Sequence, residues 1–176
     1  MLPDTRATIV QTAYDLTLER NALPSLDAVV KASGVSKGGL LHHFPTRIAL
    51  LQGLVRWLSA KSIASFDELC EQGSAVEAWL RSSTPESEEM NEVFVLLTAV
   101  QALRAAGAME DCGHEGFIAH VDRRLAAEFD GPDAQLRALL IRVVGDGLFI
   151  SALLGESLPE SSRTELLAGL TTLQLT

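Results

Sequence analysis

The residues whose types and spacing could do chemistry lie together between Ser33 and Arg47, where the chain reads SGVSKGGLLHHFPTR. Gly34 follows an apolar run with helical spacing, Ser36 is a residue type that caps helices, and Pro45 cannot continue one. Two short helices joined by a turn of about three or four residues are therefore expected, which is the outline of a helix-turn-helix.

The second helix of this motif is expected to run from Lys37 to Phe44. Leu40 and Phe44 are four residues apart and should point into the protein, so the remaining positions face outward or sideways. Those positions combine positive charge with small side chains, and they are Lys37, Gly38, Gly39, Leu41, His42 and His43. Such a face suits the major groove of DNA, where a helix reads the edges of the bases.

The stretch closely resembles the DNA-binding segment of TetR-type bacterial repressors, whose pattern is roughly AGVSKGTLYHHFPSKEAL. Residues 32–50 of this chain read ASGVSKGGLLHHFPTRIAL. The family usually has a tyrosine at the position of Leu41 and a threonine at that of Gly39, so two hydroxyl groups that could bond to DNA are missing. The resemblance is sharp over residues 5–55 and only architectural beyond.

Individual roles follow from this resemblance. It implies that Lys37, Gly39 and His42 approach base edges or adjacent phosphates, and that Thr46 and Arg47 hold the DNA backbone. Ser25, at the start of the preceding helix, is a further candidate for contact with a phosphate, because the free N–H groups of a helix N-terminus favour an anion. The predicted DNA-binding residues are Ser25, Ser36, Lys37, Gly38, Gly39, Leu41, His42, His43, Thr46 and Arg47.

The formal net charge of −9 is divided unevenly along the chain. Through Lys61 there are seven Lys and Arg residues against four Asp and Glu, a balance of +3. From Ser62 onward there are seven against nineteen, a balance of −12. We therefore expect phosphates to meet the weakly cationic first third, since the acidic remainder repels them.

Composition indicates a cytoplasmic globular protein. No basic segment followed by an apolar run opens the sequence, and the most apolar segment, residues 139–155, is short and interrupted by two charges. Cys70 and Cys112 form no CxxC pair, so no disulfide framework is expected. Packing thiols are the main interpretation of the two cysteines, and a redox-sensing pair is the alternative.

Apolar residues recur at helical spacing along the whole chain, and no alternating β pattern competes with them. We therefore predict an all-α fold of about nine helices. Residues 1–45 form a three-helix, helix-turn-helix DNA-binding domain, and residues 46–176 form a ligand-binding and dimerisation domain. A long fourth helix, residues 46–70, links the two. The last helix is predicted from the capping-box spacing of Ser162 and Glu165.

A mostly apolar pocket for a small molecule is predicted in the second domain. Aromatic residues from four helices would bound it, and polar residues on otherwise apolar faces would orient the ligand. The predicted ligand-binding residues are Trp79, Phe94, Gln101, Phe117, Arg142, Asp146 and Phe149. The alternatives are simple core packing of the rings and an ion pair between Arg142 and Asp146, which are four residues apart.

A homodimer is predicted from two apolar segments near the end of the chain. The helix over residues 133–155 is apolar almost all round, and a leucine stripe follows it, so together they need cover from a second copy. Two copies of each helix would form a four-helix bundle about a two-fold axis. The predicted interface residues are Gly147, Ala152, Gly155, Leu166, Leu170 and Leu173.

Other chemistry has weaker support. Cys112, His114, Glu115 and His120 are zinc-ligand types, but their spacing matches no closed four-ligand pattern, so no metal or other cofactor is expected. A hydrolase with Cys112 or Cys70 as nucleophile and His114 or His120 as base is the enzyme alternative. No nucleophile elbow, glycine-rich phosphate loop or paired-acid motif accompanies these residues, so no enzyme activity is expected.

The resemblance to TetR-type repressors implies that the protein is a transcriptional repressor. It would bind a near-palindromic operator as a homodimer and leave it when a small-molecule effector occupies the second domain. The alternative is a small-molecule or partner-binding protein of the same fold whose DNA binding is weakened or lost.

Overall fold

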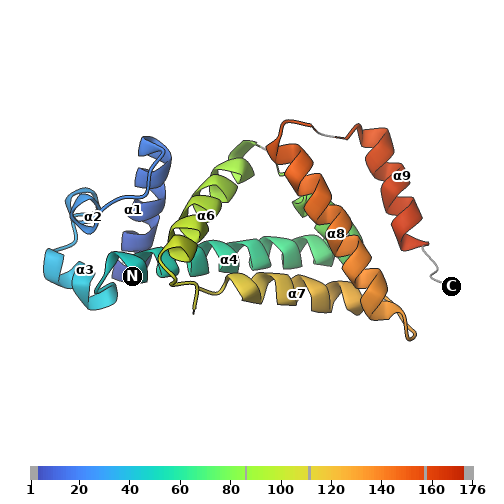
Figure 1. The fold of residues 1–176 in the computed structure, drawn as a ribbon, viewed down its shortest axis with the longest axis horizontal. Coiled ribbons are helices and arrows are strands. Elements are labelled where there is room, and N and C mark those ends of the chain that lie inside the picture. Colours follow the sequence, from blue (N-terminus) through green and yellow to red (C-terminus); the bar gives the residue numbers. More distant parts are fainter. Residues whose placement is uncertain (1–3, 86, 111, 157, 173–176) are drawn as a thin grey trace. The chain divides into compact units, whose positions relative to one another are not determined.

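The structure is a computed structural model that describes residues 4–85, 87–110, 112–156 and 158–172. Within these ranges every element of regular secondary structure is a helix, which confirms the all-α fold and the expected number of about nine helices (Figure 1). In chain order the helices are α1 (Thr5–Arg20), α2 (Leu26–Ser33), α3 (Lys37–His43), α4 (Arg47–Gln72), α5 (Ala75–Ser82), α6 (Ser87–Ala105), α7 (His114–Ala126), α8 (Ala134–Leu153) and α9 (Glu160–Thr171).

The chain divides into two compact units, and each is considered by itself. The first comprises Met1–Ala60 and Glu88–His114, and the second comprises Lys61–Ser87 and Glu115–Thr176. Helices α1 to α3 therefore share a core with α6 and the first part of α4. The predicted domain boundary after residue 45 falls inside this first unit.

In the first unit, α3 is seated by two side chains on its inner face. Leu40 and Phe44 are 0% and 1% exposed, as their spacing predicted. Phe44 packs closely on α4, because a Cβ on Gly53 would lie only 2.5 Å from Phe44 Cε1. The Arg6 guanidinium of α1 lies 5.4 Å from the centre of the same ring. The C-terminal end of α3 is thus fixed by contacts with two other helices.

Three helices of the first unit begin at side-chain caps. Ser25 Oγ accepts a hydrogen bond from the Ala28 N–H at 3.2 Å, and Ser36 Oγ accepts one from the Gly39 N–H at 3.1 Å. Thr46 Oγ1 accepts one from the Ala49 N–H at 3.0 Å. These bonds satisfy backbone donors that have no partner inside the helix, so they fix where α2, α3 and α4 begin.

The core of the second unit is built around Trp79, which is 6% exposed. Its Nε1–H donates to the Arg142 carbonyl oxygen at 3.2 Å, and its ring centroid lies 6.5 Å from that of Phe66 and 6.3 Å from that of Phe117. Gly145 faces the indole so closely that a Cβ there would overlap Nε1. The absence of a side chain at Gly145 therefore lets α8 pack on α5.

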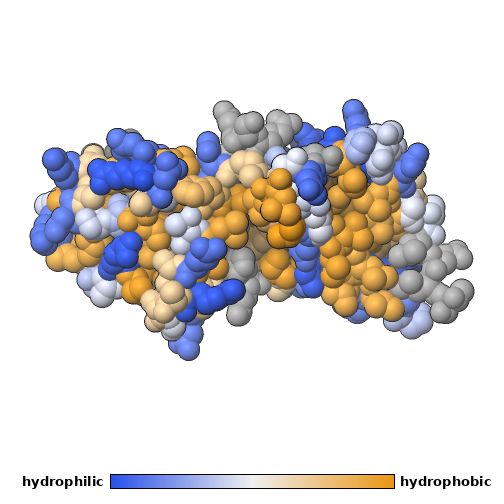
Figure 2. All heavy atoms as spheres, turned by 45° about the horizontal axis from the view of Figure 1, so that its top comes forward, coloured by the Kyte–Doolittle hydropathy of each residue, from blue (hydrophilic) through white to orange (hydrophobic). Residues whose placement is uncertain are grey.

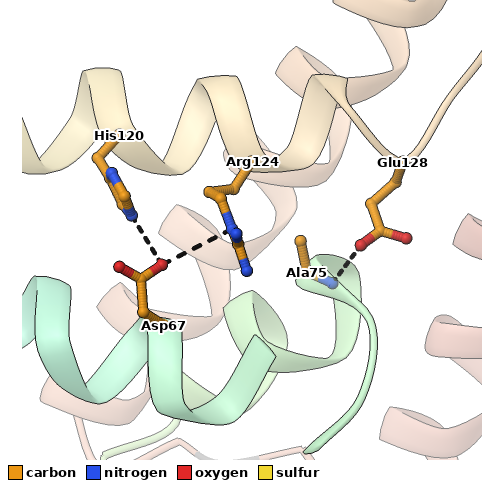
Figure 3. Close-up of polar contacts among 5 residues, drawn as sticks. All are labelled: Asp67, Ala75, His120, Arg124 and Glu128. Atoms are coloured by element: carbon orange, nitrogen blue, oxygen red, sulfur yellow. Dashed lines mark hydrogen bonds and ion pairs between the residues drawn. The ribbon is translucent and has the colours of Figure 1, made fainter. Parts of the chain in front are cut away.

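Polar contacts also hold α7 against α4 and α5 in this unit (Figure 3). His120 Nε2 lies 2.9 Å from Asp67 Oδ1, and Arg124 Nε lies 3.6 Å from the same oxygen. Glu128 Oε1 accepts a hydrogen bond of 2.7 Å from the Ala75 N–H. A carboxylate at this position is favourable because the N-terminus of α5 carries partial positive charge.

One helix start differs from the prediction. Helix α9 begins at Glu160 after Pro159, and no side chain caps it. Ser162 and Glu165 therefore lie inside the helix, and the capping box predicted from their spacing is wrong. Proline at the N-cap, with its fixed φ, starts the helix three residues earlier than a cap at Ser162 would.

The close contact at Gly145 gives a stability prediction. Gly145→Ala should lower the free energy of unfolding by about 1–3 kcal/mol, because the new methyl group overpacks against Trp79. Gly116→Ala is the control, since a Cβ at this position in α7 meets nothing within 4 Å and glycine is a poor helix residue. Urea unfolding should show a lower midpoint for the first variant alone. An equal midpoint in both variants would contradict the packing described for α8.

Candidate nucleic-acid interface

The solvent-exposed face of α3 consists of four residues. Lys37, Gly38, Leu41 and His42 are exposed, whereas Gly39 and His43 are half-buried. The exposed residues are spaced one, three and one apart, so they form a single face over nearly two turns. This face is opposite the buried Leu40, and it is the surface that α3 can offer to another molecule.

The cation of this face is already paired within the chain. Lys37 Nζ lies 3.0 Å from Asp27 Oδ1 of α2, and the two side chains are 68% and 78% exposed. An exposed pair of this kind contributes about 0–1 kcal/mol, so it can exchange for a phosphate or a base at little cost. Sequence reasoning missed Asp27, because nothing in its local pattern indicates that α2 brings it beside Lys37.

The two glycines of α3 have different surroundings. A Cβ on Gly38 would meet nothing within 4 Å, whereas a Cβ on Gly39 would lie 3.2 Å from both Ser36 Oγ and Val35 Cγ1. A larger residue at position 39 would therefore press on the cap of the helix. Gly38 leaves bare backbone on the exposed face.

Arg47 has a role inside the protein that the sequence did not reveal. Its Nε donates to the Pro24 carbonyl oxygen at 3.1 Å, and its NH2 group donates to the Leu23 carbonyl oxygen at 3.2 Å. The start of α4 is thereby tied to the loop that precedes α2. Arg47 thus positions Ser25, another predicted phosphate contact, by holding the adjacent loop.

The capping hydroxyls keep the capacity to bind an anion. Ser25 and Thr46 each use an oxygen lone pair to accept from a backbone N–H, so the hydroxyl hydrogen of each is left to donate. The rings of His42 and His43 lie edge to face with centroids 5.2 Å apart. In the part of the chain that the structure describes, no group of three or more His, Cys, Asp or Glu residues could hold a metal ion.

The predicted ligand-binding residues are divided between the two units. Trp79 and Phe117 are neighbours in the second unit, and Arg142 Nη1 donates to Asp146 Oδ2 at 2.8 Å, which is the ion pair that was the alternative to a ligand-binding role. Arg142 Nε also lies 2.8 Å from Asp122 Oδ1. Of the other three, Phe149 is half-buried on α8 of the second unit, and Phe94 and Gln101 are exposed on α6 of the first unit.

A different set of residues lines a pocket of about 280 Å³ in the second unit. Leucines from α5, α8 and α9 form part of its wall, and charged side chains surround them. The lining residues are Glu77, Leu80, Arg81, Thr84, Leu148, Glu160, Arg163, Thr164, Leu166 and Leu167. None of the predicted ligand-binding residues is among them. The sequence carries no sign of this pocket, because it depends on where α9 docks.

Two leucines of the predicted dimer interface pack within this chain. Leu170 is 8% exposed and belongs to the core of the second unit, so in this chain it packs internally. Leu166 is half-buried against the same core. Leu173 lies outside the described residues. Periodicity could show that α9 has one apolar stripe, but not that this stripe faces its own chain.

Exposed apolar residues lie instead along α8. Gly147 is exposed with open space above it, Ala152 is half-buried, and Gly155 follows the helix in a left-handed conformation with φ 78°. Figure 2 shows hydrophobic side chains gathered over the region of α8 and α9. The exposed large hydrophobic residues of α8 and its C-cap are Leu136, Leu139, Leu140, Val143, Ile150 and Leu154.

The cysteine and histidine candidates for other chemistry are divided between the two units. Cys112 is buried in the first unit and Cys70 is half-buried in the second, and both thiols are free. His120 pairs with Asp67, and the side chains of His114 and Glu115 lie outside the described part of the structure. A hydrogen bond with Cys70 raises the pKa of the Arg124 guanidinium, which stays a cation.

Comparison with known proteins identifies the fold. No protein-family profile and no curated protein matches the chain. Among solved structures, a candidate transcriptional regulator from Streptomyces coelicolor A3(2), SCO7518, is 21% identical over 97% of this chain and 100% of its own, with a TM-score of 0.75.

Two further structures carry the family description. A candidate TetR-family transcriptional regulator from Rhodococcus sp. is 20% identical over 94% of this chain and 96% of its own, with a TM-score of 0.62. The TetR-like regulator LfrR from Mycobacterium smegmatis, solved with proflavine, is 17% identical over 98% and 97% with a TM-score of 0.50. The chain therefore has the TetR-type regulator fold, as the resemblance of residues 32–50 implied.

The contacts of Arg47 give a second stability prediction. Arg47→Ala should lower the free energy of unfolding by about 1–2 kcal/mol, because two carbonyl oxygens lose a charged donor. Arg104→Ala, at an exposed position on α6 of the same unit, is the matched control and should change stability by less than about 0.5 kcal/mol. Chemical denaturation followed by circular dichroism measures both. Equal stability of the two variants would remove the positioning role of Arg47.

Proposed function

We propose that this chain is a transcriptional regulator that binds a near-palindromic operator as a homodimer and is released by a small-molecule effector. The observation that carries the proposal is the exposed face of α3, seated on Leu40 and Phe44 and flanked by the capping hydroxyls of Ser25 and Thr46. In this proposal α3 enters the major groove while the helix starts around it contact phosphates. No catalytic step is needed, and the protein acts in the cytoplasm, where it meets DNA.

The dimer in this proposal uses the outer face of α8. Leu136, Leu140 and Val143 begin a series that continues through Gly147 to Ile150 and Leu154, with steps that alternate between four and three residues. That spacing is the seam along which two helices pack side by side. Gly147, with open space above it, lets the two backbones approach closely at the middle of the seam. A two-fold axis here would present two copies of α3 about one DNA turn apart, ~34–36 Å, or at a multiple of it.

Two observations support the binding of a small-molecule effector. LfrR, which shares the fold, was solved with proflavine, and the second unit of this chain has a pocket of about 280 Å³ with a partly leucine wall. Charged residues at that pocket, Arg81 and Arg163 among them, could orient a polar group. The predicted site around Trp79 and Phe117 is the other location, and it would require these packed rings to separate.

A second candidate function is ligand or partner binding without operator binding. It is favoured by the pairing of Lys37 with Asp27, which neutralises the cation of α3, and by the absence of a hydroxyl at Leu41. A titration of the DNA upstream of the protein's own gene, followed by fluorescence anisotropy, separates the two functions. Saturable binding that competitor DNA of random sequence does not remove supports the regulator.

The role of Lys37 gives a prediction for that titration. Lys37→Ala should weaken operator binding by about 1–3 kcal/mol if the amine reads a base. If it meets only a phosphate, the loss is smaller and the slope of log K against log salt falls by about one. Asp27→Asn is the opposite test: it removes the competing carboxylate and should strengthen binding. Unchanged affinity in both variants would show that α3 is not the contact surface.

The α8 seam gives a prediction for assembly. Val143→Glu combined with Ile150→Glu should produce monomers, because two charges would be buried in the interface. Leu158→Glu is the control, since Leu158 is a similarly exposed hydrophobic residue that lies outside α8. Sedimentation velocity at tens of micromolar reads the assembly state. A monomeric wild-type protein, or a double variant that remains dimeric, would rule out this seam.

A further inference from the structure

We propose that Leu41 reads thymine, by packing its side chain against the C5-methyl group in the major groove. Operator half-sites would then carry a thymine at the base pair that faces Leu41. The inference rests on the proposed function, because it requires α3 to lie in the groove. It goes further by assigning a base preference to one residue of this chain.

The first observation is the exposure of Leu41. This large apolar side chain is 38% exposed on the outer face of α3, while its neighbour Leu40 is fully buried. Phe44 and the Ser36 cap fix the two ends of the helix, so the direction of Leu41 is set by the fold. A leucine held in solvent by a seated helix gains free energy wherever an apolar group of a partner covers it.

The second observation is the space beside Leu41. Gly38 lies one turn before it on the same face, and a Cβ there would meet nothing within 4 Å. Residues three apart are neighbours on a helix surface, so no side chain shields Leu41 on that side. The bare backbone at Gly38 allows close approach to the floor of the groove. With α3 this close to the bases, the Leu41 side chain can reach a methyl group in the groove. A larger side chain at position 38 would hold α3 farther from the bases and prevent that contact.

The third observation concerns the polar groups of the same face. Lys37 is drawn toward α2 by Asp27 at 3.0 Å, and the His42 ring lies edge to face with His43. Gly38 and Leu41, which lie between Lys37 and His42 on this face, carry no hydrogen-bonding side chain, so the middle of the face is hydrocarbon and backbone. Among the four bases, thymine alone offers a methyl group in the major groove, whereas the others offer only donors and acceptors that leucine cannot satisfy.

The experiment replaces thymine by deoxyuridine, which removes only the methyl group. A duplex is first selected from a randomised pool by the wild-type protein, and each symmetric pair of thymines is then replaced in turn. Burial of one methyl group corresponds to about fourfold in affinity, so replacement in both half-sites of one dimer site should weaken wild-type binding by about fifteenfold at one pair of positions. Fluorescence anisotropy measures each dissociation constant.

The control variants separate contact from fold. Leu41→Ala should bind the thymine and uracil duplexes with equal affinity, because the partner of the methyl group is gone. Leu41→Met keeps an apolar side chain of similar volume and should retain most of the uracil penalty. A duplex with 5-methylcytosine at the sensitive position should bind more tightly than one with cytosine, since the modified base restores the methyl group. Circular dichroism checks that both variants fold.

The outcomes are distinct. A selected duplex in which no thymine is sensitive to uracil, or a Leu41→Ala variant that keeps the full penalty, overturns the thymine contact and leaves the proposed function standing. A pool from which the wild-type protein selects no duplex overturns the proposed function and the inference with it. A penalty that is present in the wild type, retained in Leu41→Met and lost in Leu41→Ala establishes the contact.

Discussion

The packing of Phe44 against α4 is the contact on which the candidate interface depends. A two-turn helix cannot hold its own position, since short helices in water are marginal even for favourable sequences. Phe44 is the C-cap of α3, and its ring packs directly against the backbone of α4 at Gly53. Any side chain at position 53 would overlap the Phe44 ring. Leu40 adds the second buried point. The outward direction of α3 is therefore a consequence of core packing in the first unit.

Electrostatics acts on the outer side of the same helix. The pair between Lys37 and Asp27 leaves this face nearly neutral in the free protein, although the first third of the chain is weakly cationic. A neutral, partly apolar reading surface gives less sequence-independent attraction, because that attraction comes mainly from cations near phosphates. In the proposed function, specificity for an operator would then depend on the fit of α3 to the groove and on apolar contacts with the bases. A dimer would add to it by presenting two copies of α3.

Local features of the sequence were sufficient to predict the fold and the orientation of α3. The caps at Ser25 and Ser36 and the burial of Leu40 depend on residues within a few positions of one another. The partners of Arg47 and Asp27, and the burial of Leu170, depend on how distant segments dock. Periodicity shows that a face is apolar, yet it does not show whether that face meets its own chain or another. For this reason the helices could be predicted from local features, whereas the burial of Leu170 in its own chain could not.

In α3, the residues that stabilise the helix differ from those on its exposed face. Two glycines in seven residues each cost about 1 kcal/mol relative to alanine, so the helix is poor by propensity. It forms because Ser36 satisfies its first turn and because Leu40 and Phe44 bury its inner side. Gly38 and Leu41 contribute little to that stability, since one lacks a side chain and the other faces solvent. Substitutions at these two positions can therefore change what the exposed face of α3 presents without changing the fold, and in the proposed function this freedom would allow a different operator to be read.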